Sequence, residues 1–460
     1  MTSQLQSERS PAANPGTPND IESRLNDLTE AQLEEWVKAL DEDRLIKFHR
    51  NRYIPIYLNL LAVFSGTRSV EQIRSLSVEC AKASILSHRT VDFYIVKATE
   101  MAERASLEPG QSPNQDSIRF KNCDWDIFQR LLNPGKGLIA CTYRIGHYNH
   151  LILEAALMGY KVWAPMLESK YAVVDSLLKQ ARSRLAGHEP REYKGPGSKA
   201  RPENIVFLNV VNAEDPAISI RMVKVLKKNE IIFMLPDGNR GRDGVWGETS
   251  RITVDFLGFP ISVKTGAARL SFRLGTPILP VLAITDETGA DQMILGEPII
   301  PPSRSNRDDE APYIKDTMQS LYTFLGTYAV KYPEQWEGCA AVHRWRRPGT
   351  GEQPGPVESS QPSTQREEVI SALEAGESFR INEQGGIARL QTAEGDIWVD
   401  MKNLKSYKHP QWASSVSQAL SEDSGLNQSW LDSQADDSQW QGRVVSLLAD
   451  LKKLELVVGR

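Results

Sequence analysis

The chain has few cysteines, no surplus of basic residues and no long apolar run, and each absence excludes a class of protein. Its 460 residues include four cysteines, without a Cys-x-x-Cys pair or the His and Cys spacing of metal ligands. We therefore expect reduced thiols, and neither a disulfide framework nor a metal site. Lysine and arginine total 54 against 59 aspartates and glutamates, a net charge of −5 that argues against a nucleic-acid partner.

The longest apolar stretch lies between Tyr53 and Phe64 and is interrupted by Pro55. It is much shorter than the roughly 20 residues of a membrane-spanning helix. We predict no transmembrane helix and a cytoplasmic protein, for which attachment to a membrane surface stays open. Residues 1–20 are rich in Ser, Pro, Asn and Thr and have no apolar core, so they predict disorder rather than a signal peptide.

Changes in composition predict five segments, the first of them the disordered residues 1–20. Residues 21–115 carry helical periodicity, and residues 116–348 alternate between strand-like and helix-like runs. Residues 349–365 are Gly, Pro, Ser, Gln and Glu with almost nothing apolar, which is typical of a linker. Residues 366–460 regain a pattern of short alternating runs followed by helical stretches, and predict a small α+β domain.

The central segment predicts an α/β fold. Its apolar runs suit buried strands, and helical segments separate most of them, so we expect a sheet covered by helices. The expected strands are Gly137–Cys141, Lys161–Pro165, Ile205–Leu208, Ile231–Leu235, Ile252–Phe256, Pro277–Ile284 and Gln292–Leu295, and the expected helices are Leu151–Met158, Val173–Leu185, Ile218–Lys227 and Val263–Leu274.

Residues 146–154, Gly-His-Tyr-Asn-His-Leu-Ile-Leu-Glu, are the best candidate for chemistry. They follow the apolar run Gly137–Cys141 and open a periodic apolar segment that ends at Gly159, which predicts a strand, a turn and a helix. His147 lies in the turn, at the positive end of the helix dipole. That position disfavours a charged imidazolium and leaves a neutral ring that can act as a base.

A second candidate stretch runs from Phe233 to Arg242. A predicted strand there delivers Asp237 and two arginines into a glycine-rich turn. Gly238 lets backbone amides approach an anionic group, and the guanidinium of Arg240 suits bidentate contact with phosphate. Taken alone, the stretch also fits a solvated surface turn.

Taken together and in order, these stretches resemble the lysophospholipid acyltransferase superfamily, and most closely its lipid A biosynthesis (lauroyl/myristoyl) acyltransferase branch. The resemblance covers about residues 120–348, and the ordered combination is more specific than any single block. The first block, Gly146-His147-Tyr148, looks like the family motif of a His, four residues and a carboxylate, and the second, Pro236-Asp237-Gly238-Asn239-Arg240, is similar to Pro-Glu-Gly-Thr-Arg. The third runs from Phe256-Leu257-Gly258-Phe259-Pro260 to Pro280 and resembles the stretch that leads to the family's Pro-Val block. The fourth, Lys331-Tyr332-Pro333-Glu334-Gln335-Trp336 with His343-Arg344-Trp345, looks like the ending of the lipid A branch.

The resemblance implies a mixed sheet flanked by helices, with His147 as general base at one edge of a hydrophobic acyl groove. It implies that Asp237 and Arg240 hold a phosphate or polar group of the acceptor or donor and order the loop, while Gly238 and Gly258 shape the pocket. The implied activity is transfer of a fatty acyl group from acyl-CoA or acyl carrier protein to a hydroxyl or amine of a lipid, glycolipid or peptide-type acceptor. The acyl thioester is a co-substrate, and no further cofactor and no metal is expected.

Two positions depart from the family pattern. Ile152 stands where the motif carboxylate is expected, and the branch's Tyr-Arg-Pro reads Trp163-Ala164-Pro165, which favours an acceptor other than a lipid A precursor. Glu154 lies one helical turn after His150, so these two form an alternative catalytic pair. Otherwise His147 works with another partner or without one. The rival prediction is a catalytically degenerate acyl-binding or scaffold protein.

The C-terminal segment, residues 366–460, weakly resembles the winged-helix peptide-binding modules found with peptide-modifying enzymes. This resemblance implies a peptide or carrier-tethered acceptor, and a structural or dimerising tail is the alternative. The many acidic residues of the segment argue against DNA binding.

Overall fold

The computed structural model describes most of the chain, with gaps. The predicted disordered segment, residues 1–20, lies outside the described residues, as does the predicted linker up to residue 361. The described residues are 29–107, 120, 123–195, 198–238, 251–302, 307–344, 362–381, 387–392, 395–400, 405–408, 414–421, 425–434, 438–453 and 457–459.

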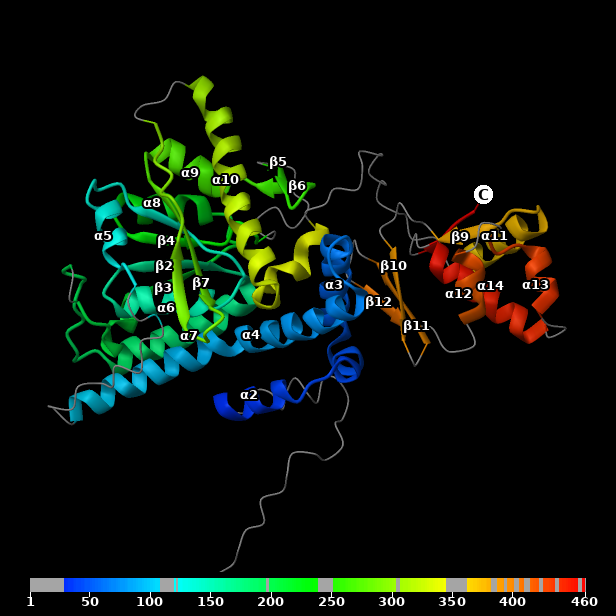
Figure 1. Ribbon diagram of the computed structural model, residues 1–460, viewed down its shortest axis with the longest axis horizontal. Helices are drawn as coiled ribbons and strands as arrows, with labels where there is room; N and C mark the ends of the chain where they lie inside the picture. Colours follow the sequence, from blue (N-terminus) through cyan, green and yellow to red (C-terminus); the bar gives the residue numbers. More distant parts are fainter. Residues whose placement is uncertain are drawn as a thin grey trace, which may run out of the picture.

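A six-stranded sheet forms the centre of the larger part of the molecule (Figure 1), and the predicted α/β fold with a mixed sheet is confirmed. The strand order is β3-β2-β4-β1-β7-β8. All neighbours are parallel except β7 and β8, which form an antiparallel hairpin. The strands are β1 (Leu138–Cys141), β2 (Val162–Met166), β3 (Leu208–Asn212), β4 (Ile231–Met234), β7 (Ile278–Thr285) and β8 (Asp291–Leu295).

Each face of the sheet carries its own hydrophobic core. All four residues of β1 are buried, because a parallel strand is covered on both faces. Side chains alternate along a strand, so Ile139 and Cys141 enter one core while Leu138 and Ala140 enter the other. Helices α8 (Ile218–Lys227), α9 (Gly266–Leu274) and α10 (Glu310–Lys331) cover the first face, and α5 (Asp126–Leu132), α6 (Tyr148–Leu157) and α7 (Glu168–Arg184) cover the second.

The N-terminal helices pack directly on this α/β unit. They are α2 (Glu30–Lys38), α3 (Glu42–Phe64) and α4 (Val70–Leu107). The long helix α4 runs beneath the sheet and contacts α6 and α7, and α2 lies against α4 (Figure 1). Asn59 of α3 donates from Nδ2 to the Cys339 carbonyl at 2.7 Å, and Cys80 of α4 contacts the Pro333 carbonyl. No helix among the described residues is long and apolar enough to cross a bilayer.

Two of the predicted elements are wrong in detail. Residues Ile205–Leu208, expected as a strand, are mostly a 3₁₀ helix, η2 (Pro202–Phe207), with proline in its first turn, and β3 begins only at Leu208. The expected helix Val263–Leu274 begins at Gly266, because Val263 belongs to a hairpin of β5 (Arg251–Phe256) and β6 (Phe259–Lys264). The antiparallel ladder pairs Ile252 with Val263, and this pairing outweighs local helical periodicity.

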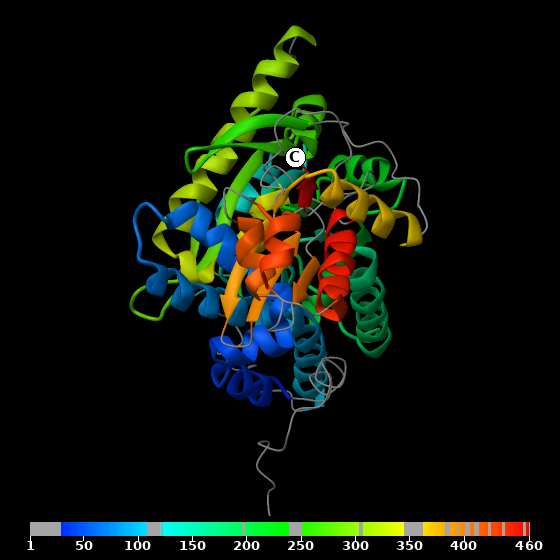
Figure 2. The same cartoon turned by 90° about the vertical axis from the view of Figure 1, so that its right-hand side faces the viewer.

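The described residues of the C-terminal segment form three antiparallel strands, a second strand pair and four helices. Figure 2 views this part of the molecule from the front. The three-stranded sheet has the order β10-β11-β12, and β9 pairs with β13. The helices share a small apolar core that includes Val369, Val416 and Leu448. The winged-helix resemblance stays a prediction. The elements are α11 (Pro362–Glu374), β9 (Phe379–Ile381), β10 (Ile387–Thr392), β11 (Gly395–Asp400), β12 (Lys405–Lys408), α12 (Ser414–Ser421), α13 (Gln428–Gln434), α14 (Ser438–Lys453) and β13 (Val457–Gly459).

His49, at a kink in α3, predicts loss of stability in mild acid. Its ring packs edge-on against Trp36, and burial, followed by the charge of Arg52, lowers its pKa from 6.5 to about 4. The unfolded chain therefore binds the additional proton between these two pKa values, so stability falls as the pH drops below 6.5. We expect His49→Gln to reduce the loss at pH 5 by about 1 kcal/mol, allowing for partial exposure of the ring.

The measurement is the urea midpoint of wild type and variant at pH 5 and pH 7.5, followed by tryptophan fluorescence. The midpoint should change less with pH in the variant. An equal change in both proteins would show that His49 does not carry this acid sensitivity.

Candidate active site

His147 follows Gly146, a position that has no space for a side chain. After β1 the chain runs beside β7, where Gly146 forms a bridge with Ala283 and His147 N–H donates to the Ala283 carbonyl at 2.6 Å. Gly146 has a φ of +57°, and a Cβ there would lie 2.1 Å from the Ala283 oxygen. Because the backbones approach so closely, His147 is held against the end of β7, at the start of α6.

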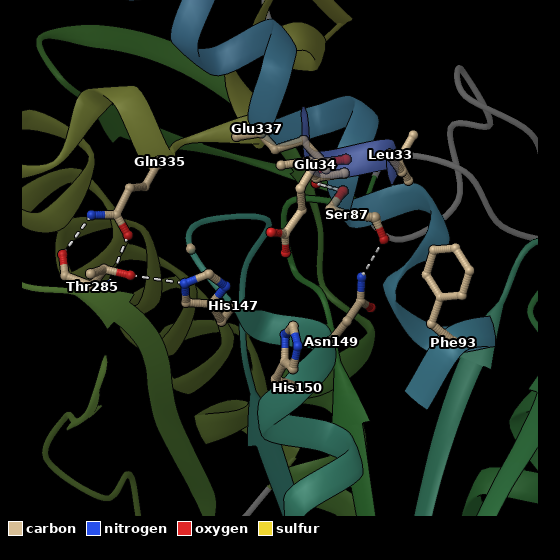
Figure 3. Close-up of a pocket in the computed structure, with 13 residues that line it drawn as sticks. Leu33, Glu34, Ser87, Phe93, His147, Asn149, His150, Thr285, Gln335 and Glu337 are labelled. Carbon is tan, nitrogen blue, oxygen red and sulfur yellow. Dashed lines mark hydrogen bonds between the residues drawn. The ribbon is translucent and has the colours of Figure 1, made fainter. Parts of the chain in front are cut away.

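The His147 ring contacts a hydroxyl and a carboxylate, both from the β7–β8 hairpin. Figure 3 shows the contact with the hydroxyl, that of Thr285. His147 Nε2 lies 2.8 Å from Thr285 Oγ1 and 3.3 Å from Asp291 Oδ1. Thr285 Oγ1 donates to Asp291 Oδ1 at 2.7 Å. Both ionisable side chains are largely buried, with exposed fractions of 26% for His147 and 15% for Asp291.

The hairpin register explains why these two side chains meet. Thr285 and Asp291 are directly paired across β7 and β8, and paired residues of an antiparallel ladder project from the same face. The intervening turn is closed by Asp286, whose Oδ1 accepts from Thr288 N–H at 2.8 Å and Ala290 N–H at 3.0 Å. Gly289 completes the turn at a φ of +80°.

Gln335 ties the same strand end to the loop before His147. Its Oε1 accepts from Thr285 N–H at 2.9 Å, its Nε2 donates to the Thr285 carbonyl at 2.6 Å, and its own carbonyl accepts from Gly146 N–H at 2.9 Å. Gln335 ends the short helix η4 (Pro333–Gln335). The side chain of Gln335 holds Thr285 and its main-chain carbonyl holds Gly146, so this one residue fixes the two relative to each other.

A cavity of about 330 Å³ opens beside the His147 ring. In Figure 3 Thr285 lies on one side of the ring, and Asn149 and His150 lie on the other. Leucine and phenylalanine side chains from α2 and α4 supply apolar walls. The described residues that line the cavity are Leu33, Glu34, Ala83, Leu86, Ser87, Phe93, Gly146, His147, Asn149, His150, Thr285, Gln335 and Glu337.

Glu337 is a second acidic group in the cavity wall and begins η5 (Glu337–Arg344). It accepts from Ser87 Oγ at 2.5 Å and from Tyr148 Oη at 3.2 Å. Burial raises the pKa of Glu337 above its ordinary value, while the nearby Arg144 charge opposes that shift. Ser87 belongs to α4, so the N-terminal helices contribute directly to the cavity.

One comparison with known proteins bears on the part of the chain that follows His147. Residues 208–345 match the family described as bacterial lipid A biosynthesis acyltransferase. This match indicates an acyltransferase. The predicted resemblance to the lipid A branch and the prediction of an acyltransferase are thereby confirmed. No curated protein matches the chain.

The matched acyltransferase segment contains Thr285, Asp291, Gln335 and Glu337, and it begins after His147. Of these four residues, only Gln335 stood within a block that the sequence analysis singled out. The others carry no local signal, because their relation to His147 depends on β7 lying next to β1 and on the hairpin register.

His150 and Glu154 occupy different surroundings in the acyltransferase. His150 lines the cavity, and its buried ring packs edge-on against Tyr94 at a centroid distance of 4.2 Å and against His147 at 5.4 Å. Glu154 is fully buried, is not among the described cavity-lining residues, and accepts from Phe120 N–H at 3.3 Å. Their catalytic pairing stays a prediction.

Three of the predicted substrate-binding residues, Asp237, Gly238 and Gly258, are not among the described residues that line the cavity. Asp237 is fully buried, and its Oδ2 accepts from Arg144 N–H at 3.1 Å and Arg144 Nε at 3.2 Å, so it holds the loop that leads to His147. Burial raises the pKa of Asp237, and Arg144 opposes this. Gly238 follows it, Gly258 sits in the exposed β5–β6 turn at a φ of +80°, and Arg240 is outside the described residues.

The described part of the chain has no set of side chains suited to binding a metal ion. No group of three or more His, Cys, Asp or Glu side chains there could hold a metal ion. The site's polar groups are instead arranged around one histidine ring.

Proposed function

We propose that this acyltransferase moves a fatty acyl group from an acyl thioester to a hydroxyl or amine, with His147 as general base. The observation that carries the proposal is the His147 ring, which lies at the cavity wall with Nε2 held 2.8 Å from Thr285 Oγ1. The Thr285 contact fixes the orientation of a ring that also lines the cavity. An orientated base within reach of the nucleophile typically contributes about 10²- to 10⁴-fold to the rate.

In the proposed reaction the acceptor O–H or N–H gives its proton to the His147 ring as its oxygen or nitrogen attacks the thioester carbonyl carbon. The carbon–sulfur bond then breaks, and the departing thiolate takes the proton back from the ring. The products are an ester or amide and a free thiol, and the ring returns to its starting state.

The charges of the cavity wall favour an acceptor without phosphate. Glu34 and Glu337 supply carboxylates, and no lysine or arginine is among the described lining residues. A phosphorylated acceptor would face repulsion there, whereas an acceptor that carries an amine or ammonium group beside its nucleophile would be attracted. This agrees with Ala164, which stands where the lipid A branch has arginine.

Both acyl-CoA and acyl carrier protein are suitable donors, and the acyl chain would enter along the apolar walls formed by Leu33, Leu86 and Phe93. Action at a membrane surface is compatible with a lipid acceptor. A peptide-type acceptor would instead engage residues 366–460.

The test is mass spectrometry of the purified full chain incubated with medium- and long-chain acyl-CoA and acyl carrier protein. Each donor is offered with a neutral alcohol, an amino alcohol, a lysyl peptide and a phosphorylated sugar. We expect thiol release with acyl transfer in the wild type and at least about 100-fold slower transfer in His147→Ala. His150→Ala serves as the comparison, since it alters the same cavity and leaves the His147 ring in place.

Equal rates in wild type and His147→Ala would refute His147 as the base, and a selective loss in His150→Ala would favour the His150 and Glu154 pair. Donor that binds without thiol release in any protein would support the degenerate acyl-binding alternative. Preferential acylation of the phosphorylated sugar would overturn the assignment of the acceptor class.

A further inference from the structure

We propose that Asp291 is the positioning residue of His147 and replaces the motif carboxylate that the family carries where this chain has Ile152. The inference rests on the proposed function of His147 as base. It places the orienting carboxylate on strand β8, whereas the family motif places it on the helix that follows the histidine, here α6.

The hydrogen bonds determine which ring nitrogen carries the proton. The Thr285 hydroxyl has one proton and donates it to Asp291 Oδ1 at 2.7 Å. Thr285 Oγ1 can then only accept from the ring, so His147 Nε2 carries the hydrogen in the 2.8 Å contact. This places the basic lone pair on Nδ1, away from Thr285, and Nδ1 is the atom that accepts the proton of the acceptor.

Asp291 also stabilises the charge that forms during the reaction. When Nδ1 takes a proton, the ring becomes an imidazolium whose Nε2–H lies 3.3 Å from Asp291 Oδ1. Because both side chains are largely buried, water screens this attraction only weakly. The carboxylate therefore selects the tautomer of the neutral ring and stabilises the imidazolium. The aspartate of hydrolase triads has the same two functions.

Residue 152 is an isoleucine and cannot supply a polar partner for His147. Ile152 is buried, with 5% of its surface exposed, in the apolar core on the α6 face of the sheet. The Asp291 carboxylate reaches the ring because it is paired with Thr285 across the hairpin. Among the described residues, the other ionisable groups that line the cavity beside the ring are His150 of α6, Glu34 of α2 and Glu337 of η5.

The experiment is the substitution Asp291→Asn, which keeps the size of the side chain and removes its charge. The amide of the new side chain would donate to Thr285 Oγ1, so the hydroxyl would turn its proton toward Nε2 and favour the opposite tautomer. We expect kcat for acyl transfer to fall about 100-fold or more with little change in KM. The acid limb of the kcat/KM profile should move to lower pH, since loss of the carboxylate disfavours the imidazolium.

The matched control is Glu287→Gln, which removes the same charge from an exposed position in the same turn. A second pair, Thr285→Val and Thr285→Ser, separates loss of the hydroxyl from a change of shape. Ring ¹⁵N chemical shifts of His147, assigned with His147→Ala, report the tautomer without any turnover. We expect the Nε2–H form in wild type, Glu287→Gln and Thr285→Ser, and a shift toward Nδ1–H in Asp291→Asn.

Wild-type ring shifts that show Nδ1–H, or shifts and kcat that are unchanged in folded Asp291→Asn, would overturn the inference. A wild type without turnover, in which Asp291→Asn still changes the tautomer, would refute the proposed activity and leave the positioning contact supported. A fall in kcat without any change of the pH profile or tautomer would count against the positioning role, because it would mean a structural defect.

Discussion

Replacing Gly146 with alanine is expected to reduce acyl transfer to the background rate and to lower the free energy of unfolding by about 2 kcal/mol or more. Two costs combine at this position. An alanine at a φ of +57° is strained, and its Cβ would lie 2.1 Å from the Ala283 carbonyl oxygen, a backbone atom that cannot turn aside. The loop would have to move away from β7, and the His147 ring would leave Thr285.

Gly135→Ala is the matched control for this variant. Gly135 also has a positive φ, +75°, but a Cβ there has nothing within 4 Å. It should therefore lose only about 1 kcal/mol from backbone strain and keep full activity. Chemical unfolding and the thioester assay measure both effects. Similar losses in the two variants would show that the close approach to Ala283 is unimportant.

Removing the carboxylate of Asp237 is expected to destabilise the protein by about 3 kcal/mol and to lower kcat. Asp237→Ala would leave Arg144, whose side chain is only 24% exposed, without its buried partner, and would free the loop before His147. The family resemblance also predicts that Asp237 binds a substrate group. If substrate binding were its main role, the variant would mainly raise KM and keep the stability of the wild type.

The two explanations are separated by measuring unfolding and steady-state kinetics on the same samples. Asp316→Ala, at an exposed position on α10, is the control for loss of a negative charge. A stable Asp237→Ala protein with an unchanged kcat and a raised KM would contradict the structural role and support substrate binding.

The parts of this protein that could be predicted from sequence are those encoded within short segments. The strand, turn and helix around His147 follow from an apolar run, a glycine and a periodic segment, and the structure places β1 and α6 there. The α/β alternation likewise predicted the central sheet. Residues Val263–Leu274 show the limit, because an antiparallel neighbour, β5, turned the start of an expected helix into a strand.

The surroundings of His147 could not be predicted in the same way. Asp291 is far from His147 in sequence and becomes its neighbour only because β7 adds next to β1 and β8 then folds back on β7. Gln335 was visible as part of a family block, but its contacts with Thr285 and Gly146 depend on the tertiary fold. The absence of a carboxylate at Ile152 was evident from the sequence, whereas the carboxylate that contacts the ring, Asp291, was not.

The pairing of Thr285 with Asp291 places a constraint on the length of one turn. Side chains alternate between the two faces of a strand, so inserting or deleting a single residue between them would send the carboxylate to the opposite face of β8. A protein that takes its orienting group from a hairpin can thus vary an exposed turn residue such as Glu287, while Gly289 and the number of residues in the turn stay fixed. In relatives that share Ile152, this invariant spacing would be the signature to seek, in place of the motif that follows the histidine.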